Sequence, residues 1–248
     1  MSGHNKFSKI KNIKAKNDAA TGKIFTKIGR EIQVAVKEGG PDPNSNAKLK
    51  NLIAKARANN MPNDNITRSI KRASGELGSV NYEAITYEGY GPAGSAIIVE
   101  ALTDNKNRTA SDVRHLFDKF GGSLGATNCV SYLFSRKGII IIPRGMGISD
   151  DDLMMMALDA GAEDCVMYDT YAEVTTTPEA FESAKTYFDE NKIAYDSADL
   201  DLVPASYLTL PEDKLSSFQK LIESLEDNDD IQEVYHNVEL PEEEDEEE

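Results

Sequence analysis

The side chains of this sequence that could carry chemistry are mainly lysines and arginines, and they gather in its first part. Residues 1–72 contain 16 Lys and Arg against 5 Asp and Glu, a net charge of +11. The other residues contain 11 against 38, a net charge of −27, so the whole chain carries −16. Clustered cations bind polyanions by neutralising phosphates, whereas the acidic part repels the same ligand. The residues predicted to bind nucleic acid are Lys6, Lys9, Lys11, Lys14, Lys16, Lys23, Lys27, Arg30, Lys37, Lys48, Lys55, Arg57, Arg68, Lys71 and Arg72.

Five of these lysines lie within residues 5–17, where little apolar sequence separates them. Like charges at this density repel one another, and the segment has too few apolar residues to form a core. We therefore expect residues 5–17 to be a mobile arm, or a frayed helix, that becomes ordered on a polyanion.

Three amphipathic helices are predicted to present the remaining cations. Residues 23–38 place apolar side chains on one stripe at 100° per residue and end at Gly39-Gly40-Pro41, a typical C-terminal signal. A second helix is predicted after a cap at Asn44-Ser45, and a third after Pro62 with Asn63 as its cap. Because the connections are short, we predict a three-helix bundle with a basic surface.

The rest of the chain alternates strands and helices, which predicts an α+β, multidomain protein: the N-terminal three-helix bundle followed by two α/β sandwich-like domains. Residues 138–203 follow the order β-α-β-β-α-β, the ferredoxin-like arrangement. Strands are expected at 82–88, 95–103, 129–134, 138–142, 165–168, 172–176, 194–203 and 231–235, and helices at 108–120, 149–160, 178–191 and 211–225.

The last helix and strand lack a sheet of their own in this order. We expect them to return to the sheet of residues 80–135, which makes the ferredoxin-like domain an insertion. The predicted domains are 1–76 (basic, with its arm), 80–135 plus 205–238 (discontinuous) and 136–204 (inserted). Residues 239–248 include eight acidic side chains and are predicted to be a disordered tail.

Catalytic and metal-binding patterns are weak in this sequence. Gly89-Tyr-Gly91-Pro-Ala-Gly94 matches the dinucleotide fingerprint, but a strand-like run follows where the fingerprint needs a helix, so a hairpin turn is predicted. The three histidines have no partner at metal-ligand spacing, and Cys129 and Cys165 have no metal or redox spacing. We therefore expect no catalysis, no cofactor, no metal and no small-molecule substrate.

Hydropathy gives no sign of a membrane segment. The longest apolar run, Gly138–Ile142, is far shorter than the roughly 20 residues of a membrane span. The lysine-rich amino-terminal residues lack the apolar core of a secretory signal. We expect a cytoplasmic protein.

Short motifs that belong together occur in order along nearly the whole chain. They are Gly3-His4 with Lys6, residues 22–27, 30–32, Gly39-Gly40 with Asp42-Pro43, 60–62, 87–92, 104–109, Gly121-Gly122 with Leu124-Gly125, and 234–237. Together they resemble the YebC/PmpR family, whose mitochondrial member is the translational activator of cytochrome c oxidase. The resemblance implies an N-terminal helical domain, two α/β domains, no catalysis and a cytosolic role in gene expression.

For some family members the resemblance implies a DNA-binding transcriptional regulator, and for others a ribosome-associated factor that relieves stalling at proline-rich stretches. We favour the ribosome-associated factor, with ribosomal RNA as partner, because a lysine-rich arm suits an irregular RNA surface. The alternative is a transcriptional regulator that binds promoter DNA. A further alternative is an adaptor that binds a protein.

Overall fold

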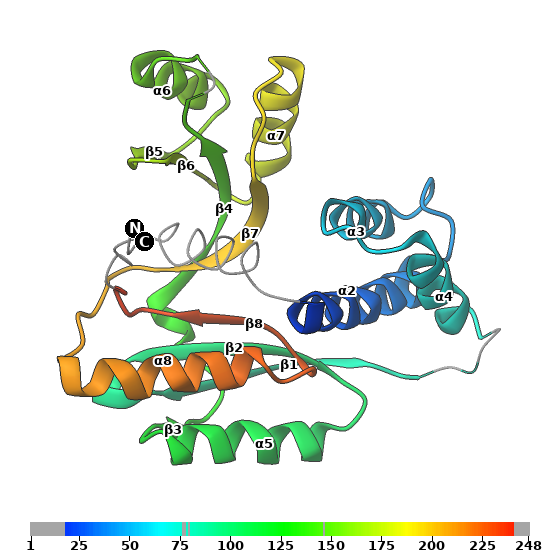
Figure 1. Cartoon of the computed structure of the whole chain (residues 1–248), viewed down its shortest axis with the longest axis vertical. Coiled ribbons are helices and arrows are strands. Elements are labelled where there is room, and N and C mark those ends of the chain that lie inside the picture. The colour runs from blue at the N-terminus through cyan, green and yellow to red at the C-terminus, as the bar shows by residue number, and fades with distance from the viewer. Residues whose placement is uncertain (1–17, 76–77, 79, 146, 241–248) are drawn as a thin grey trace. The chain divides into compact units, whose positions relative to one another are not determined.

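The structure, a computed structural model, describes residues 18–75, 78, 80–145 and 147–240, with side chains from residue 21 onward. Figure 1 labels its helices and strands. Contacts divide the described chain into two compact units: residues 18–130 with 210–236, and residues 131–209 with 237–240. The predicted arm at 5–17 and most of the predicted acidic tail lie outside the described residues.

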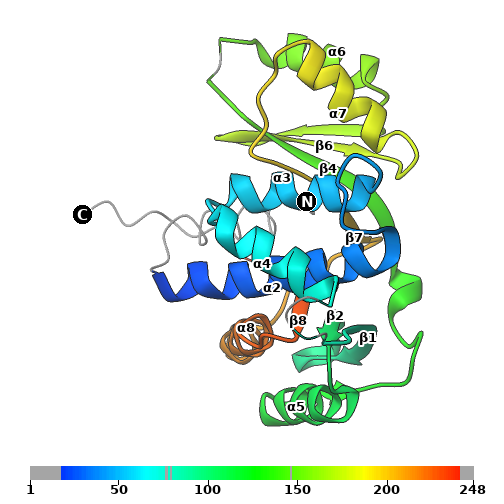
Figure 2. The ribbon, with the colours of Figure 1, turned by 90° about the vertical axis from the view of Figure 1, so that its right-hand side faces the viewer.

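Three helices form the amino-terminal part of the first unit: α2 (Asp18–Gly39), α3 (Ala47–Ala58) and α4 (Asn63–Ala73). Both α3 and α4 pack against α2 (Figure 2). Their shared core contains Ile28 and Ile32 of α2, Leu49 of α3 and Ile66 of α4. These are positions that the helical periodicity assigned to the apolar stripes, so the predicted three-helix bundle is confirmed.

The two predicted helix caps were wrong. Asn46, not Asn44-Ser45, caps α3: its side-chain oxygen accepts a hydrogen bond from the Leu49 backbone N–H at 3.0 Å. Helix α4 begins at Asn63 itself, with Pro62 at the N-cap position and no side-chain cap. The amide nitrogen of Asn46 also donates to the Ala35 carbonyl at 2.7 Å. This contact with α2 favours Asn46 as the cap, and the local sequence of α3 does not encode it.

A four-stranded antiparallel sheet completes the first unit, in the order β3 (Ser123–Leu124), β1 (Glu83–Tyr90), β2 (Ala96–Thr103), β8 (Ile231–His236). Helices α5 (Lys106–Lys119) and α8 (Glu212–Glu226) pack against the sheet and contact each other. Gly89 of β1 permits this packing, since a Cβ there would lie 2.7 Å from the Phe117 ring of α5. The C-terminal strand therefore does return to the first sheet, as expected.

Residues 129–134 do not form the predicted strand. A 3₁₀ turn, η2 (Ser131–Leu133), precedes β4 (Phe134–Pro143), and the two-residue strand β3 was not predicted. The buried carboxylate of Glu88 explains the departure, because it accepts hydrogen bonds from the backbone N–H groups of Asn128 at 2.8 Å and Val130 at 2.9 Å. In a strand, these N–H groups would need the carbonyls of a neighbouring strand, whereas here the carboxylate accepts their hydrogen bonds.

The second unit is the predicted βαββαβ domain: β4, α6 (Asp150–Asp159), β5 (Asp164–Met167), β6 (Tyr171–Thr176), α7 (Phe181–Glu190) and β7 (Ser197–Pro204). Its antiparallel sheet has the order β5-β6-β4-β7, which is the ferredoxin-like order. The central strand β4 is buried on both faces: Ile140 and Ile142 join the core with α6 and α7, while Ile139 and Ile141 cluster with Tyr171.

Candidate nucleic-acid interface

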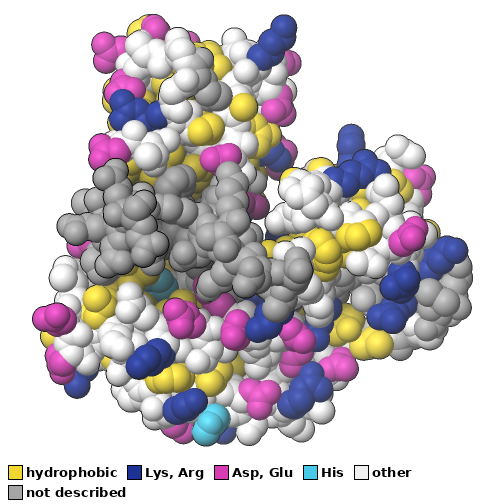
Figure 3. Space-filling model, viewed as in Figure 1, with side chains coloured by type: hydrophobic (Ala, Val, Ile, Leu, Met, Phe, Trp, Pro, Cys, Tyr) yellow, Lys and Arg dark blue, Asp and Glu magenta, His cyan; other side chains and the backbone are white. Residues whose placement is uncertain are grey.

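The predicted cations separate into three groups once the structure is known. Lys6, Lys9, Lys11, Lys14 and Lys16 lie outside the described residues. Those of α2 contact other parts of the same unit, and those of α3 and α4 lie on the surface of the bundle. Figure 3 shows Lys and Arg side chains exposed over this region.

The cations of α2 mostly contact the last residue of α8 and the segment between α8 and β8. Lys23 pairs with Asp227 at 2.9 Å, and the Lys27 ammonium donates to the Glu226 carbonyl at 2.9 Å. Arg30 pairs with Asp230 at 2.6 Å. These side chains lie opposite the bundle core, as the helical periodicity indicated, but that face of α2 contacts an acidic loop. Their predicted role in binding nucleic acid stays a prediction.

Lys37, near the end of α2, is exposed and also has partners. Its ammonium donates to the Val80 carbonyl at 2.6 Å and to the Asn81 side-chain oxygen at 3.1 Å. These bonds attach the end of α2 to the residues that lead into β1. A phosphate would have to compete with them for this ammonium.

Asp230 is the centre of the contacts around Arg30. Its carboxylate accepts hydrogen bonds from Arg30 at 2.6 Å, Arg108 at 2.8 Å, Thr109 at 2.7 Å and Thr103 at 3.2 Å. Burial alone would raise the pKa of Asp230, but the hydrogen bonds from Arg108, Thr109 and Arg30 outweigh it and lower this pKa to about 2. The carboxylate is therefore ionised at neutral pH, and it joins α2 to α5 and to the start of β8.

Five exposed cations of α3 and α4 have no hydrogen-bond or ion-pair partner among the described residues. They are Lys50, Arg57, Arg68, Lys71 and Arg72. Lys50 and Arg57 lie seven residues apart on one face of α3, and the other three lie within two turns of α4. Lys50 was not among the predicted binding residues, although its place on the helix would have identified it.

Two further predicted cations, Lys48 and Lys55, form ion pairs at the surface. Lys48 pairs with Glu38 at 2.8 Å and Lys55 with Glu31 at 3.3 Å. Exposed pairs of this kind contribute only about 0–1 kcal/mol, so a phosphate can replace the carboxylate at little cost. Both lysines remain candidates for binding.

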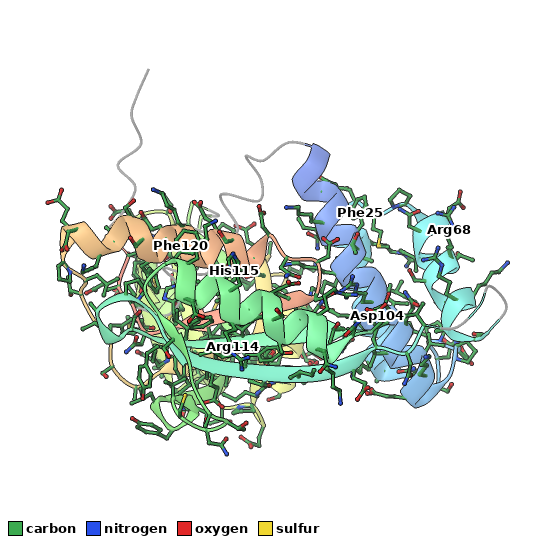
Figure 4. The ribbon with its side chains drawn as sticks, turned by 90° about the horizontal axis from the view of Figure 1, so that it is seen from below. Phe25, Arg68, Asp104, Arg114, His115 and Phe120 are labelled. Carbon is green, nitrogen blue, oxygen red and sulfur yellow. The ribbon has the colours of Figure 1, made fainter. Side chains whose placement is uncertain are left out.

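A groove of about 280 Å³ runs between α2 and α4. Its α2 wall includes Phe25 and Gln33, its α4 wall includes Arg68 and Arg72, and Tyr82 adds a second aromatic ring. Figure 4 labels Phe25 and Arg68 on these neighbouring helices. No single motif in the sequence indicates this groove, because the groove depends on how two helices pack against each other.

The described histidines and Cys165 show no arrangement suited to catalysis. His236 is buried against Phe218, and His115 is exposed on α5 (Figure 4). Burial raises the pKa of Cys165 to about 11, so this thiol is a poor nucleophile. The Gly89–Gly94 motif leads from β1 into β2, as predicted. It contains one 3₁₀ turn, η1 (Pro92–Gly94), and strand β2 follows where a pyrophosphate site needs an α-helix. Among the described residues there is no group of His, Cys, Asp and Glu suited to a metal, and no helix is long and apolar enough to span a membrane.

Comparisons with known proteins cover nearly all of this chain. Residues 5–76 match the family described as TACO1/YebC protein N-terminal domain, and residues 82–238 match TACO1/YebC second and third domain. A relative from Acetivibrio thermocellus, named a probable transcriptional regulatory protein, is 56% identical over 238 residues, covering 96% of this chain and 98% of its own. A relative from Clostridium botulinum with the same name is 54% identical over 242 residues, covering 98% of both chains.

A solved structure has the same fold. The crystal structure of a conserved hypothetical protein from Aquifex aeolicus matches with a TM-score of 0.83 at 42% identity, covering 94% of this chain and 96% of that one. The likeness extends over helical and sheet regions alike.

Proposed function

Because this chain belongs to the TACO1/YebC family, we propose that it is a non-enzymatic, cytoplasmic, nucleic-acid-binding regulator of gene expression that acts on transcription. The sequence alone favoured a ribosome-associated factor. The names of the relatives support the transcriptional alternative better, since they describe probable transcriptional regulatory proteins.

The observation that carries the proposal is the set of five exposed, unpartnered cations on α3 and α4, which we call the free cations: Lys50, Arg57, Arg68, Lys71 and Arg72. Within the described part of the chain, no carboxylate neutralises them. Nucleic acid gives such cations a favourable partner, because each neutralised phosphate releases counterions.

The salt dependence of binding to duplex DNA tests this proposal. If all five free cations contact phosphates, the logarithm of the binding constant falls against the logarithm of salt concentration with a slope of about −4.5. Replacing both lysines in the variant Lys50→Gln/Lys71→Gln is expected to reduce the steepness of the slope by about 2. Fluorescence anisotropy with a labelled duplex measures both slopes.

Lys220→Gln is the matched control, since Lys220 is also exposed and unpartnered among the described residues but lies on α8 in the acidic part. Its slope should equal that of the wild type. Equal slopes for all three proteins, or no binding at low salt, would contradict the proposal.

The ribosome-associated role is the second candidate, and the groove between α2 and α4 favours it. Aromatic rings beside unpartnered arginines are typical of sites for unpaired bases, which RNA loops offer more often than duplex DNA does. In this reading, the factor would bind ribosomal RNA and relieve stalling at proline-rich stretches.

Crosslinking in living cells, followed by sequencing of the nucleic acid that copurifies, distinguishes the two candidates. Enrichment of DNA upstream of genes supports a transcriptional regulator, whereas enrichment of ribosomal RNA supports the ribosome-associated role. Ribosome profiling of a deletion strain gives an independent result: unchanged pausing at proline-rich stretches rejects the second candidate.

A further inference from the structure

The groove between α2 and α4 exists because the two helices approach closely at small residues. Gly29 of α2 faces Ser69 of α4, and a Cβ on Gly29 would lie 3.1 Å from the Ser69 hydroxyl oxygen. Phe25 and Gln33 of α2, with Arg68 and Arg72 of α4, line the groove around this contact. Its volume of about 280 Å³ is just below the range of pockets for small molecules, about 300–1,000 Å³, and suits a ligand group of the size of one base.

Two buried polar atoms at the groove have no hydrogen-bond partner among the described residues. The Gln33 side chain is 5% exposed; its amide nitrogen donates to the Gly29 carbonyl at 3.2 Å, but its oxygen accepts no hydrogen bond. The Nε of Arg30 is also buried and unpaired, although Nη1 of the same guanidinium bonds to Asp230. Buried polar atoms are usually paired in folded proteins, so this acceptor and this donor favour a water molecule or a polar ligand group that can reach them.

The walls of the groove are aromatic and cationic. Phe25 lies on one wall, and the Tyr82 ring lies 5.2 Å from the Arg30 guanidinium. Arg68 and Arg72 lie one turn apart on α4, are exposed, and have no partner in the described part of the chain. They are separated by about 6 Å along the helix axis, so they can meet two phosphates of one strand.

We propose that this groove binds one unpaired nucleotide of a single strand, with its base beside Phe25 and Tyr82 and its phosphates on Arg68 and Arg72. The base edge donates a hydrogen bond to the side-chain oxygen of Gln33 and accepts one from Nε of Arg30, since every base carries both kinds of group. This inference rests on the proposed function, because it needs a nucleic-acid partner. It goes further by naming the group that the groove binds, an unpaired nucleotide. Stacking on aromatic rings tolerates all bases, so the groove selects unpaired bases rather than a sequence.

Binding of the full-length protein to labelled ten-nucleotide strands tests the proposal. The strands are oligo(dA), oligo(rA) and an abasic strand with the same number of phosphates. The wild type is expected to bind at least one of the base-bearing strands about tenfold more tightly than the abasic strand, within the range for one stacked base. The comparison of oligo(dA) with oligo(rA) identifies whether DNA or RNA is the better source of the nucleotide.

Two variants locate the effect. Gln33→Met keeps the size of the side chain but removes its polar atoms, and Tyr82→Leu removes the second ring; in both, the ratio of base-bearing to abasic affinity is expected to fall toward one. Lys220→Gln serves as the control and should keep the wild-type ratio. Thermal unfolding, monitored by circular dichroism, verifies that each variant is folded. If only one variant folds, its affinity ratio alone decides the test: a ratio near one supports the proposal, and an unchanged ratio contradicts it.

The outcomes separate this inference from the proposed function. Equal affinity of the wild type for base-bearing and abasic strands overturns the inference while nucleic-acid binding stands. No binding to any strand or duplex at low salt rejects both. Hexaglutamate that displaces the strands at equal concentration would show an acidic peptide site and overturn the inference as well.

Discussion

Asp230 shows how one residue links distant segments of this chain. Its carboxylate is buried and accepts hydrogen bonds from Arg30 of α2 and from Arg108 and Thr109 of α5. Taking a carboxylate out of water is costly, and here several donors offset that cost. The same contacts occupy Arg30, which helical periodicity alone had assigned to an exposed basic face.

The low pKa of Asp230 predicts a defined pH dependence. The folded-state pKa of about 2 lies below the ordinary value of 3.8, so the carboxylate stabilises the fold fully above about pH 5, by about 2 kcal/mol. This contribution is lost as the pH falls from about 4 toward 2. Asp230→Asn should lower the free energy of unfolding by about 3 kcal/mol at pH 7, and the difference from wild type should shrink by about 1 kcal/mol at pH 3.

Urea unfolding at pH 7, 5 and 3 measures this difference. Asp229→Asn is the matched control, because Asp229 is exposed and has no partner among the described residues. A pH-independent difference between Asp230→Asn and wild type would contradict the assigned pKa.

At the scale of elements, the connection between α2 and α3 determines how the bundle closes. Gly40, with φ of +85°, ends α2 and donates from its N–H to the Val36 carbonyl at 2.8 Å. Asn46 then caps α3 while its amide nitrogen donates to the Ala35 and Gly40 carbonyls. One buried side chain therefore ends one helix and begins the next.

Replacing Asn46 tests this assignment. Asn46→Ala removes the cap of α3 and leaves the Ala35 carbonyl without this partner, so the free energy of unfolding should fall by about 2–3 kcal/mol. Ser45→Ala, at the position that the sequence predicted as a cap, should change it by no more than about 0.5 kcal/mol. Thermal or urea unfolding of the two variants decides which residue is the cap.

At the scale of the whole molecule, the charge asymmetry has a consequence for affinity. Residues 241–248 contain seven acidic side chains, and removing them changes the net charge from −16 to −9. Less negative charge means weaker repulsion of nucleic acid, an effect that salt screens over about 10 Å at 0.1 M. The truncated protein should therefore bind DNA more tightly than the full chain at low salt, with a difference that narrows as salt rises.

Anisotropy titrations of both proteins at 20 and 300 mM salt measure this effect. Replacing the seven acidic residues of 242–248 with neutral residues, rather than deleting the segment, separates the effect of charge from that of chain length. Identical affinities at low salt would show that the acidic end does not influence binding.

The amino-acid sequence by itself determined the features that depend on neighbours along the chain. The apolar stripes of residues 23–38 and 63–73 and the β-α-β-β-α-β order of residues 138–203 follow from local periodicity. The opposite charges of residues 1–72 and the remainder follow from composition. Each of these patterns predicts the same local structure or charge, whichever segment packs against it in the fold.

Only the tertiary structure decided which distant residues meet. It paired β8 with β2 and brought Lys23, Lys27 and Arg30 to the acidic residues before β8. It also formed the groove in which the side-chain oxygen of Gln33 has no partner among the described residues. The physical reason is that a charged or polar side chain has the same local signature whether it faces water, a carboxylate or a ligand. Its partner is chosen by packing between segments as much as 200 residues apart, as for Arg30 and Asp230.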